Sequence, residues 1–357
     1  MSGPRPSTAV SELTAYRVPR VDLPMDLWLD ANEGGAPPAE LLVALGGLNP
    51  EVVRRYPKSA RLQGIIADRF GVAEERVLLT DGSNDALERA CRAVLEPGRT
   101  ALIPSPTFEM LPRYARLAGG EVRETSWEGE AFPTDDALAA AGPDVALVFV
   151  VSPNNPTGAV ATADDLIRLS RGLPDALLVV DLAYTEFAEE DLTKVALELP
   201  NALAVRTFSK AWGLAGLRLG CAIGPPEVVR WLRIAGQNYP VSALTLAAAE
   251  MRLDGDASDV AAYVERVRSE RVHLHALLGE LGAASHPSQA NFVLGRFGDA
   301  AAIQLGLARR GISVRAFPGR AGLEDALRIT CPGEPEAFDR LCLALREVIP
   351  RQRKEES

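Results

Sequence analysis

The lysine at position 210 stands in an unusual setting for a basic residue. It lies in the apolar, glycine-rich stretch TFSKAWGLAGLRLG (207–220), directly after a β-like run, whereas Lys58, Lys194 and Lys354 lie among polar residues. Arginine supplies the rest of the 38 basic side chains. A lysine amine can lose its proton and attack a carbonyl carbon, which arginine cannot do. The setting therefore makes Lys210 a candidate for a Schiff base with an aldehyde.

A phosphate site is predicted around RVLLTDGSNDALERA, which is typical of a strand, a Gly-Ser turn and the start of a helix. Gly82 lets the backbone approach an anion, and the free N–H groups of the helix start face it. Ser83 and Asn84 can also cap the helix, which such turns do in proteins without a phosphate site. Arg218, which follows Lys210 in the same glycine-rich stretch, is a natural partner for a phosphate dianion.

Three further side chains lie where predicted strands end. Asn155 lies in the turn SPNNPTG, Asp181 ends the apolar run LLVVD, and Tyr184 follows shortly after it. In α/β proteins, ligands bind at the carboxyl ends of the strands. A carboxylate in such an apolar strand is costly unless it meets a cation. Asn155 and Asp181 could also serve only to cap their own turns.

Together these parts fit one cofactor, pyridoxal phosphate. Its aldehyde would take Lys210, and its ring hydroxyl would meet Asn155 and Tyr184. Asp181 would keep the pyridine nitrogen protonated, which makes the ring an electron sink. Phe108 in SPTFEM would cover the ring face. The phosphate would lie in a cup of Gly82, Ser83, Thr207, Ser209 and Arg218, with Asn84 beside them.

Short apolar runs alternate with helical patterns between about Val77 and Gly224, and several of the runs lack polar alternation. Such runs are typical of strands buried on both faces of a mostly parallel α/β sheet. From about residue 243 the pattern changes to two helices, the strands NFVLGRF, ISVRAF and ALRITC, and a last helix. This order predicts a smaller α+β domain in which the strands of Arg315 and Arg328 lie side by side.

The chain resembles the histidinol-phosphate aminotransferase family of fold-type I pyridoxal-phosphate enzymes over almost its full length. The resemblance rests on LDANEG, RRYPKS, DGSNDAL, PSPTF, SPNNPTG, DLAYTEF, RTFSKAWGLAGLRLG, ANFVL and DALRIT. It implies a large cofactor-binding domain, residues 36–242, with a mostly parallel seven-stranded sheet between helices, and a small α+β domain, residues 243–357. Residues 1–35 would form an arm that packs with the small domain or a partner subunit.

The resemblance also implies roles for individual residues. Lys210 would hold the cofactor as an internal aldimine and then act as base and acid, with Asp181 and Tyr184 as the other catalytic residues. Tyr56 would reach the cofactor phosphate of the other subunit of a homodimer. The substrate-binding residues would be Tyr16, Asn155, Arg315 and Arg328. The implied reaction is ping-pong transfer of the amino group of L-histidinol phosphate to 2-oxoglutarate, which gives imidazole-acetol phosphate and glutamate.

The sequence departs from the family pattern near the expected pocket. Leu182 stands where the family usually has glutamate, Leu111 and Cys221 replace common tyrosines, and the N-terminal motif reads ANEGG. An aromatic amino-acid or secondary-metabolite aminotransferase is therefore an alternative. A threonine-phosphate decarboxylase is another, although DALRIT and the position of Arg315 speak against it. A pyridoxal-phosphate sensor fused to a DNA reader is disfavoured, because the sequence shows no winged-helix pattern or basic region.

The composition limits the remaining classes of function. A net charge of −10 disfavours nucleic-acid binding. No apolar run approaches the length of a membrane span, and the first residues carry no hydrophobic signal core. The cysteines form no CxxC pair and HExxH is absent, so no metal site is predicted. We expect a cytoplasmic enzyme whose partners are a small amino donor, a 2-oxo acid and a second copy of the chain.

Overall fold

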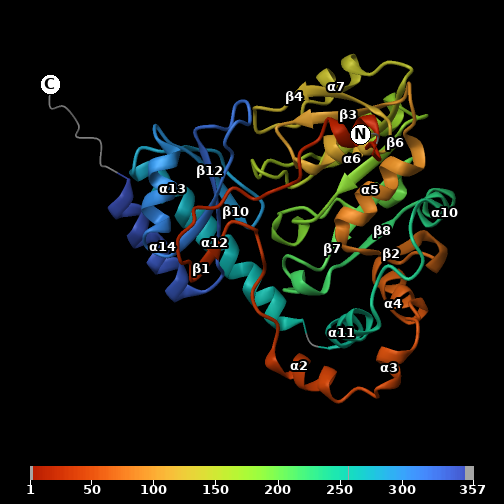
Figure 1. Ribbon diagram of the computed structural model, residues 1–357, viewed down its shortest axis with the longest axis horizontal. Helices are drawn as coiled ribbons and strands as arrows, with labels where there is room; N and C mark the ends of the chain where they lie inside the picture. Colours follow the sequence, from red (N-terminus) through yellow and green to blue (C-terminus); the bar gives the residue numbers. More distant parts are fainter. Residues whose placement is uncertain (1–2, 256, 350–357) are drawn as a thin grey trace.

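A seven-stranded sheet forms the middle of the larger part of the molecule (Figure 1), in a computed structural model that describes residues 3–255 and 257–349. Its strand order is β2-β8-β7-β6-β5-β3-β4, and only the pairs that β8 makes with β2 and β7 are antiparallel. The strands are β2 (Val77–Asp81), β3 (Thr100–Ser105), β4 (Glu121–Ser126), β5 (Val145–Val151), β6 (Leu177–Asp181), β7 (Ala202–Thr207) and β8 (Leu219–Ile223). The predicted mostly parallel sheet is confirmed.

Helices cover both faces of this sheet (Figure 1). Along β5, Leu147 and Phe149 pack into one core with α5, α6 and α10, whereas Val148 and Val150 pack into a second core with α7, α8 and α9. Successive side chains of a strand point to opposite faces, so a strand between two helical layers needs an unbroken apolar run. The helices and short 3₁₀ turns here are α4 (Ala60–Phe70), η1 (Glu74–Arg76), α5 (Gly82–Val94), α6 (Met110–Leu117), α7 (Thr134–Ala140), α8 (Ala163–Gly172), η2 (Thr185–Phe187), α9 (Thr193–Glu198), η3 (Ala215–Leu217) and α10 (Pro226–Ala235).

A second sheet of five strands forms the smaller part, in the order β1-β11-β12-β10-β9. Its edge strand β1 comes from the N-terminal segment and runs parallel to β11, while the other pairs are antiparallel. Arg315 of β11 and Arg328 of β12 are direct partners in the register, which confirms that their strands lie side by side. The elements are β1 (Leu27–Leu29), α12 (Ser258–Glu280), β9 (Ala284–Ser285), β10 (Phe292–Arg296), α13 (Ala300–Ala308), β11 (Ile312–Ala316), β12 (Ala326–Thr330) and α14 (Pro335–Val348).

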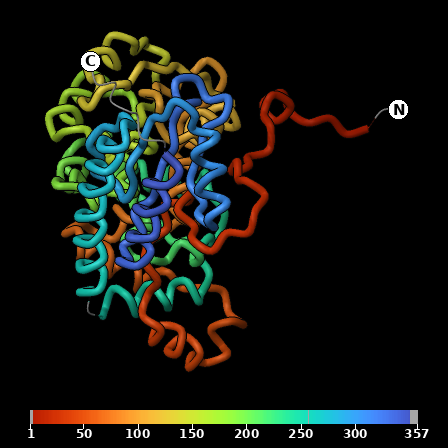
Figure 2. Tube along the Cα trace, turned by 90° about the vertical axis from the view of Figure 1, so that its left-hand side faces the viewer, coloured from red at the N-terminus to blue at the C-terminus, as the bar shows by residue number. Residues whose placement is uncertain are grey.

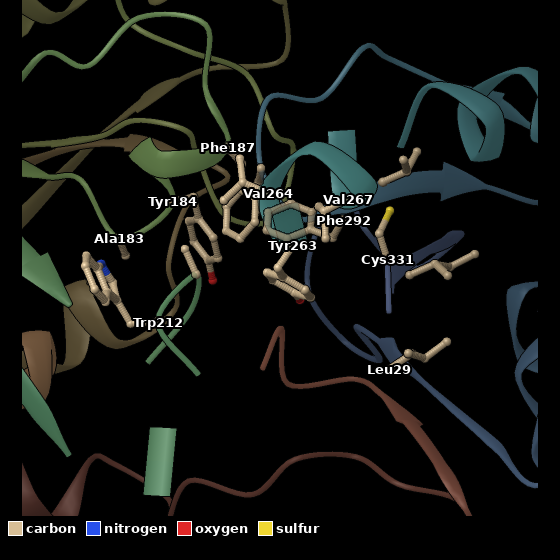
Figure 3. Packing of buried hydrophobic residues seen from close by; sticks show 14 of the residues in the cluster. Leu29, Ala183, Tyr184, Phe187, Trp212, Tyr263, Val264, Val267, Phe292 and Cys331 are labelled. Carbon is tan, nitrogen blue, oxygen red and sulfur yellow. The ribbon is translucent and has the colours of Figure 1, made fainter. Parts of the chain in front are cut away.

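The two parts share one apolar core. Figure 3 shows Tyr184 and Phe187, from the loop after β6, close to Tyr263 of α12 and Phe292 of β10. The rings of Tyr184 and Phe292 meet edge to face with centroids 5.2 Å apart, an arrangement that aromatic pairs prefer. This packing closes the space between the large sheet and the small sheet from one side. It thereby fixes the wall of the cavity described below.

The remaining helices come from the N-terminal segment and from the stretch between α10 and α12. They are α1 (Thr8–Ser11), α2 (Ala39–Gly46), α3 (Glu51–Arg54) and α11 (Ala243–Asp254). The start of the chain projects to one side in Figure 2, and α11 packs against α2 and α4. The proposed domain limits at residues 35 and 242 stay predictions. Residues 1–2 of the predicted arm and residues 350–357 of the predicted small domain lie outside the described residues. No helix among the described residues is long and apolar enough to cross a bilayer.

Candidate active site

One cavity of about 290 Å³ lies between the carboxyl ends of β5, β6 and β7 and the strands β11 and β12. Most side chains singled out from the sequence line it, although they come from segments far apart in the chain. Those lining it are Tyr16, Ser83, Asn84, Phe108, Asn155, Asp181, Tyr184, Thr207, Ser209, Lys210, Arg218, Arg315 and Arg328. Gly82 and Tyr56 are not among the residues that line it. The roles of these residues stay predictions, but their meeting in one cavity is a structural fact.

Lys210 follows the end of β7, and its side chain is half-buried in the cavity. Its Nζ donates a hydrogen bond to the backbone oxygen of Ala31 at 3.0 Å and lies 5.5 Å from the ring centre of Tyr184. Burial, with the nearby Arg328 guanidinium, lowers the pKa of Lys210 to about 7. A large share of the amine is therefore neutral at physiological pH, which is the form that attacks an aldehyde.

The backbone around Lys210 is packed closely against the N-terminal segment. A Cβ atom on Gly34 would overlap the backbone oxygen of Lys210, so this position excludes any larger residue. The segment that follows β1 thereby lies directly against the loop of the lysine.

Asp181 ends β6 and is 4% exposed. One of its oxygens accepts a hydrogen bond from the backbone N–H of Ala183 at 3.1 Å, and no ion pair reaches it among the described residues. Burial raises the pKa of Asp181 to about 6, while the Ala183 N–H and the charge of Lys210 act in the opposite direction. Burying a carboxylate without a cationic partner costs desolvation free energy, so a bound cation would stabilise the ionised Asp181. The protonated pyridine nitrogen of pyridoxal phosphate is such a cation.

A cradle for a phosphate lies where α5 begins. Gly82 has φ +71°, and a Cβ atom there would overlap the Arg218 guanidinium. Arg218 donates a 3.4 Å hydrogen bond to Ser209 Oγ, and the N–H of Ser209 donates to Thr207 Oγ1 at 3.1 Å. The first N–H groups of a helix have no partner within it, so they are free for an anion. These residues fit the phosphate of the predicted cofactor.

The expectation that Ser83 or Asn84 caps this helix is wrong. The helix begins at Gly82, so both residues lie within its first turn, and Asp81 is the N-cap without a side-chain cap of its own. Instead, a carboxylate oxygen of Asp85 accepts a hydrogen bond from the Asp81 N–H at 3.1 Å. Ser83 and Asn84 are therefore left to face the cavity, where both are lining residues.

The side of the cavity next to Tyr184 is held by a buried hydrogen-bond network. Asn32, in the left-handed region at φ +54°, donates from Nδ2 to the Tyr184 hydroxyl at 3.0 Å. Arg328 donates at 2.6 Å both to Asn155 Oδ1 and to the backbone oxygen of Asp30. The Asn155 oxygen is thus occupied, which leaves its NH₂ group to donate toward a ring oxygen. Burial raises the pKa of Tyr184, so its hydroxyl keeps its proton.

The three substitutions that depart from the family pattern lie away from this cavity. Leu182 and Leu111 are buried in the two cores on either face of the large sheet, and Cys221 is buried in the core shared by the two parts. None of the three is among the cavity-lining residues. These three residues therefore contribute to core packing and do not line the cavity. Burial raises the pKa of the Cys221 thiol to about 12.

A carboxylate that the sequence analysis did not single out stands at the far end of the cavity. Glu109 Oε1 accepts a hydrogen bond from the Tyr16 hydroxyl at 2.9 Å and pairs with Arg315 Nη2 at 2.6 Å. Burial and the charge of Glu109 raise the pKa of Tyr16. Glu109 directly follows Phe108 in SPTFEM, and an acidic residue beside a predicted ring-stacking residue was the available signal. Asn32 was likewise missed.

Tyr56 is placed on the surface. It is 77% exposed, and its ring stacks on the exposed Tyr239 with centroids 4.7 Å apart. Within one subunit it is not a cavity-lining residue.

Comparisons with known proteins cover nearly the whole chain. The family described as aminotransferase class I and II matches residues 52–345. Histidinol-phosphate aminotransferase 1 of Nostoc sp. is 33% identical over 327 residues, 90% of this chain and 91% of the relative. The histidinol-phosphate aminotransferase of Symbiobacterium thermophilum is 36% identical, with 90% of each chain covered. A crystal structure of histidinol-phosphate aminotransferase from Sinorhizobium meliloti in complex with pyridoxal-5'-phosphate has 25% identity and a TM-score of 0.87, with 98% of both chains covered.

Proposed function

Because this chain belongs to the histidinol-phosphate aminotransferases, within the class I and II aminotransferases, we propose that it transfers the amino group of L-histidinol phosphate to 2-oxoglutarate. The enzyme is a pyridoxal-phosphate-dependent transaminase. The observation that carries the choice of donor is the meeting of Tyr16, Arg315 and Arg328 in the same cavity as Lys210. A cationic subsite in the same cavity as the lysine suits an amino donor with a phosphate at its other end.

The chemistry is divided between the cofactor and this chain. Pyridoxal phosphate, when bound, supplies an electron sink for the negative charge that develops at the substrate carbon bearing the amino group. The buried carboxylate of Asp181 would hold a proton on the pyridine nitrogen. Lys210 Nζ, with its pKa near 7, would take the proton from the substrate carbon and deliver it to the cofactor, because an amine of that pKa gives and accepts protons readily at neutral pH.

Substrate positioning falls to residues of the small sheet and the N-terminal segment. Arg328 is held by Asn155 and by the backbone of Asp30, so its guanidinium is fixed before a ligand arrives. A fixed guanidinium binds an anion with a smaller loss of conformational entropy. In this proposal Arg315 and Tyr16 meet the donor phosphate, and Arg328 also meets a carboxylate of 2-oxoglutarate in the second half of the ping-pong cycle.

A comparison of half-reactions tests the proposed donor. The purified holoenzyme is mixed with L-histidinol phosphate, L-histidinol, L-phenylalanine or threonine phosphate, and loss of the cofactor's visible absorbance is followed together with release of carbon dioxide. Histidinol phosphate should react fastest and release no carbon dioxide. A faster reaction with phenylalanine would refute the proposed donor in favour of an aromatic aminotransferase. Carbon dioxide from threonine phosphate would indicate a decarboxylase.

We also propose that the enzyme is a cytoplasmic homodimer in which Tyr56 reaches the neighbouring active site. Large apolar side chains are exposed on the surface around α2 and α3, which is the pattern of an interaction surface. They are Leu42, Val43, Val53, Tyr56 and Tyr239.

Hybrid dimers test this arrangement. Tyr56→Ala and Lys210→Ala should each be nearly inactive alone, since every site lacks one of the two side chains. When the two variants exchange subunits, one site of each hybrid regains both, and activity should return. Failure to regain activity in verified hybrids, or a fully active monomer, would refute the role of Tyr56.

A further inference from the structure

The far end of the cavity already holds an anion that belongs to the chain. The Glu109 carboxylate accepts the Tyr16 hydroxyl and pairs with Arg315, through one oxygen atom. The Arg315 side chain is only 5% exposed, and its Nη1 has no hydrogen-bond partner among the described residues. Nη2 of Arg315 is therefore bound to Glu109, whereas Nη1 remains free to bind a ligand.

A substrate phosphate and the Glu109 carboxylate compete for Nη2 of Arg315. Arginine binds phosphate best through two parallel N–H groups, and Glu109 occupies one of them. A dianion placed beside the carboxylate would also meet repulsion between like charges in a poorly hydrated site. Two-point binding of a donor phosphate by Nη1 and Nη2 of Arg315 therefore requires that Glu109 move.

The structure offers Glu109 a second position. Its side chain is 30% exposed, and it also lines a neighbouring cavity of about 750 Å³. Arg320 lines both cavities and has no ion pair among the described residues. The Arg320 guanidinium is held close by, since it donates to the backbone oxygen of Thr107, two residues before Glu109.

Arg320 is thus electrostatically suited to receive the carboxylate. Burial lowers the pKa of Arg320, and the charge of Glu109 is the largest influence that raises it again. The Arg315 and Arg320 guanidinium groups both lie against the Phe317 ring, 5.6 Å and 5.9 Å from its centre. The same ring therefore packs against both cations.

We propose that Glu109 is a specificity-determining residue that occupies the distal anion subsite and is displaced from Arg315 toward Arg320 by the phosphate of the donor. This inference rests on the proposed function, in which the donor is a phosphate monoester. Only a group that binds Arg315 more tightly than the Glu109 carboxylate does can displace Glu109 and occupy the subsite. Weakly bound anions are kept out, and the empty site avoids an unpaired buried guanidinium.

Binding of inorganic phosphate to the holoenzyme tests the first half of the proposal. With the cofactor site filled, calorimetry of Glu109→Gln should show at least about tenfold tighter phosphate binding than wild type, because the competing charge is gone. Adding Arg315→Ala to that variant should abolish the gain. Glu128→Gln is the matched control, since Glu128 is an exposed carboxylate that lines the neighbouring cavity and has no ion pair to Arg315 or Arg320 among the described residues. Equal binding by Glu109→Gln and wild type, or an equal gain in the control, overturns the proposal.

The second position is tested by a double-mutant cycle with Arg320→Met. That variant should raise the KM for L-histidinol phosphate several-fold, because the displaced carboxylate has lost its partner. Much of the increase should vanish when Glu109→Gln is added. Strict additivity overturns the movement toward Arg320.

The two proposals fail in different ways. A holoenzyme that does not transaminate histidinol phosphate, but whose Glu109→Gln variant still binds phosphate more tightly through Arg315, refutes the donor and upholds the role of Glu109. A holoenzyme that transaminates histidinol phosphate with no change in phosphate binding or KM in Glu109→Gln refutes the role of Glu109 alone.

Discussion

Replacing Asp181 by asparagine is expected to stabilise the cofactor-free protein at neutral pH while removing most of its activity. Burial raises the pKa of Asp181 from 3.8 to about 6. Because the folded protein holds this proton more tightly than the unfolded chain does, ionisation of Asp181 opposes folding. A difference of about two between the folded and unfolded pKa corresponds to about 3 kcal/mol. This destabilisation is absent below the unfolded pKa, develops as the pH rises from about 4 to 6, and is complete above about pH 6.

The substitution isolates the charge because it keeps the shape. An asparagine oxygen can still accept the hydrogen bond from the Ala183 N–H. Activity should fall because a neutral amide cannot hold the proton on the pyridine nitrogen, so the electron sink is weakened. Stability and activity should therefore change in opposite directions, which distinguishes a functional charge from a structural one.

Urea unfolding of the two cofactor-free proteins between pH 4 and pH 8 provides the measurement. All other titrating groups are common to both, so the difference between them reports Asp181. The variant should be more stable by about 3 kcal/mol at pH 8 and nearly equal to wild type at pH 4. A difference that does not change with pH would refute the reasoning, as would near-normal turnover of the variant with the cofactor correctly bound.

Further substitutions and pH changes test the other parts of the site. Lys210→Ala should fold, because a half-buried amine with one hydrogen bond contributes little packing, but it should lose the cofactor's visible absorbance and turnover; a borohydride-reducible adduct in this variant would point to another lysine. Arg315→Ala should raise the KM for histidinol phosphate about 10- to 100-fold and that for histidinol much less, since a buried charge-assisted hydrogen bond contributes on the order of 1.5–3 kcal/mol; additive effects of the substitution and of removing the phosphate would exclude the contact. Arg328→Ala should slow both half-reactions, and a defect confined to one of them would contradict its double role. The rate at which cofactor-free protein binds pyridoxal phosphate should fall about tenfold per pH unit below pH 7, because the pKa of Lys210 is about 7 and only the neutral amine reacts; a rate that instead keeps rising up to pH 10 would show that the amine is not neutralised by its surroundings.

The large sheet was predictable because burial on two faces leaves a clear trace in sequence. β5 is an unbroken run of apolar residues, and β6 is apolar up to its last residue, Asp181, as the run LLVVD predicted. β4 was missed because it is an edge strand of sequence EVRETS, whose side chains are exposed or half-exposed. β1 was missed because three residues, one of them an exposed tryptophan, are too few to show the alternation of apolar and polar residues that marks a strand. Strands of this kind form because they hydrogen-bond to a neighbouring strand, which is β3 for β4 and β11 for β1.

The site was predictable where residue type and local motif suffice. Lys210 and Asp181 have unusual types for their surroundings; Asp181 ends β6, and Lys210 follows the end of β7. Asn32 and Glu109 have ordinary types, and their importance comes from contacts with Tyr184 and Arg315 across more than a hundred residues of chain. Such long-range contacts are set by how the two sheets meet. No spacing in the sequence encodes them.

The pairing of β1 with β11 has a practical consequence for anyone shortening this protein. The family match begins at residue 52, which suggests a natural point for trimming. A protein that starts there would lack Tyr16, the Ala31 oxygen that holds Lys210, and Asn32 beneath Tyr184. It would also leave the β11 edge bare, and an unpaired strand edge invites association with other chains. The trimmed protein should aggregate and bind its cofactor poorly, even though the whole stretch that matches the class I and II aminotransferase family remains.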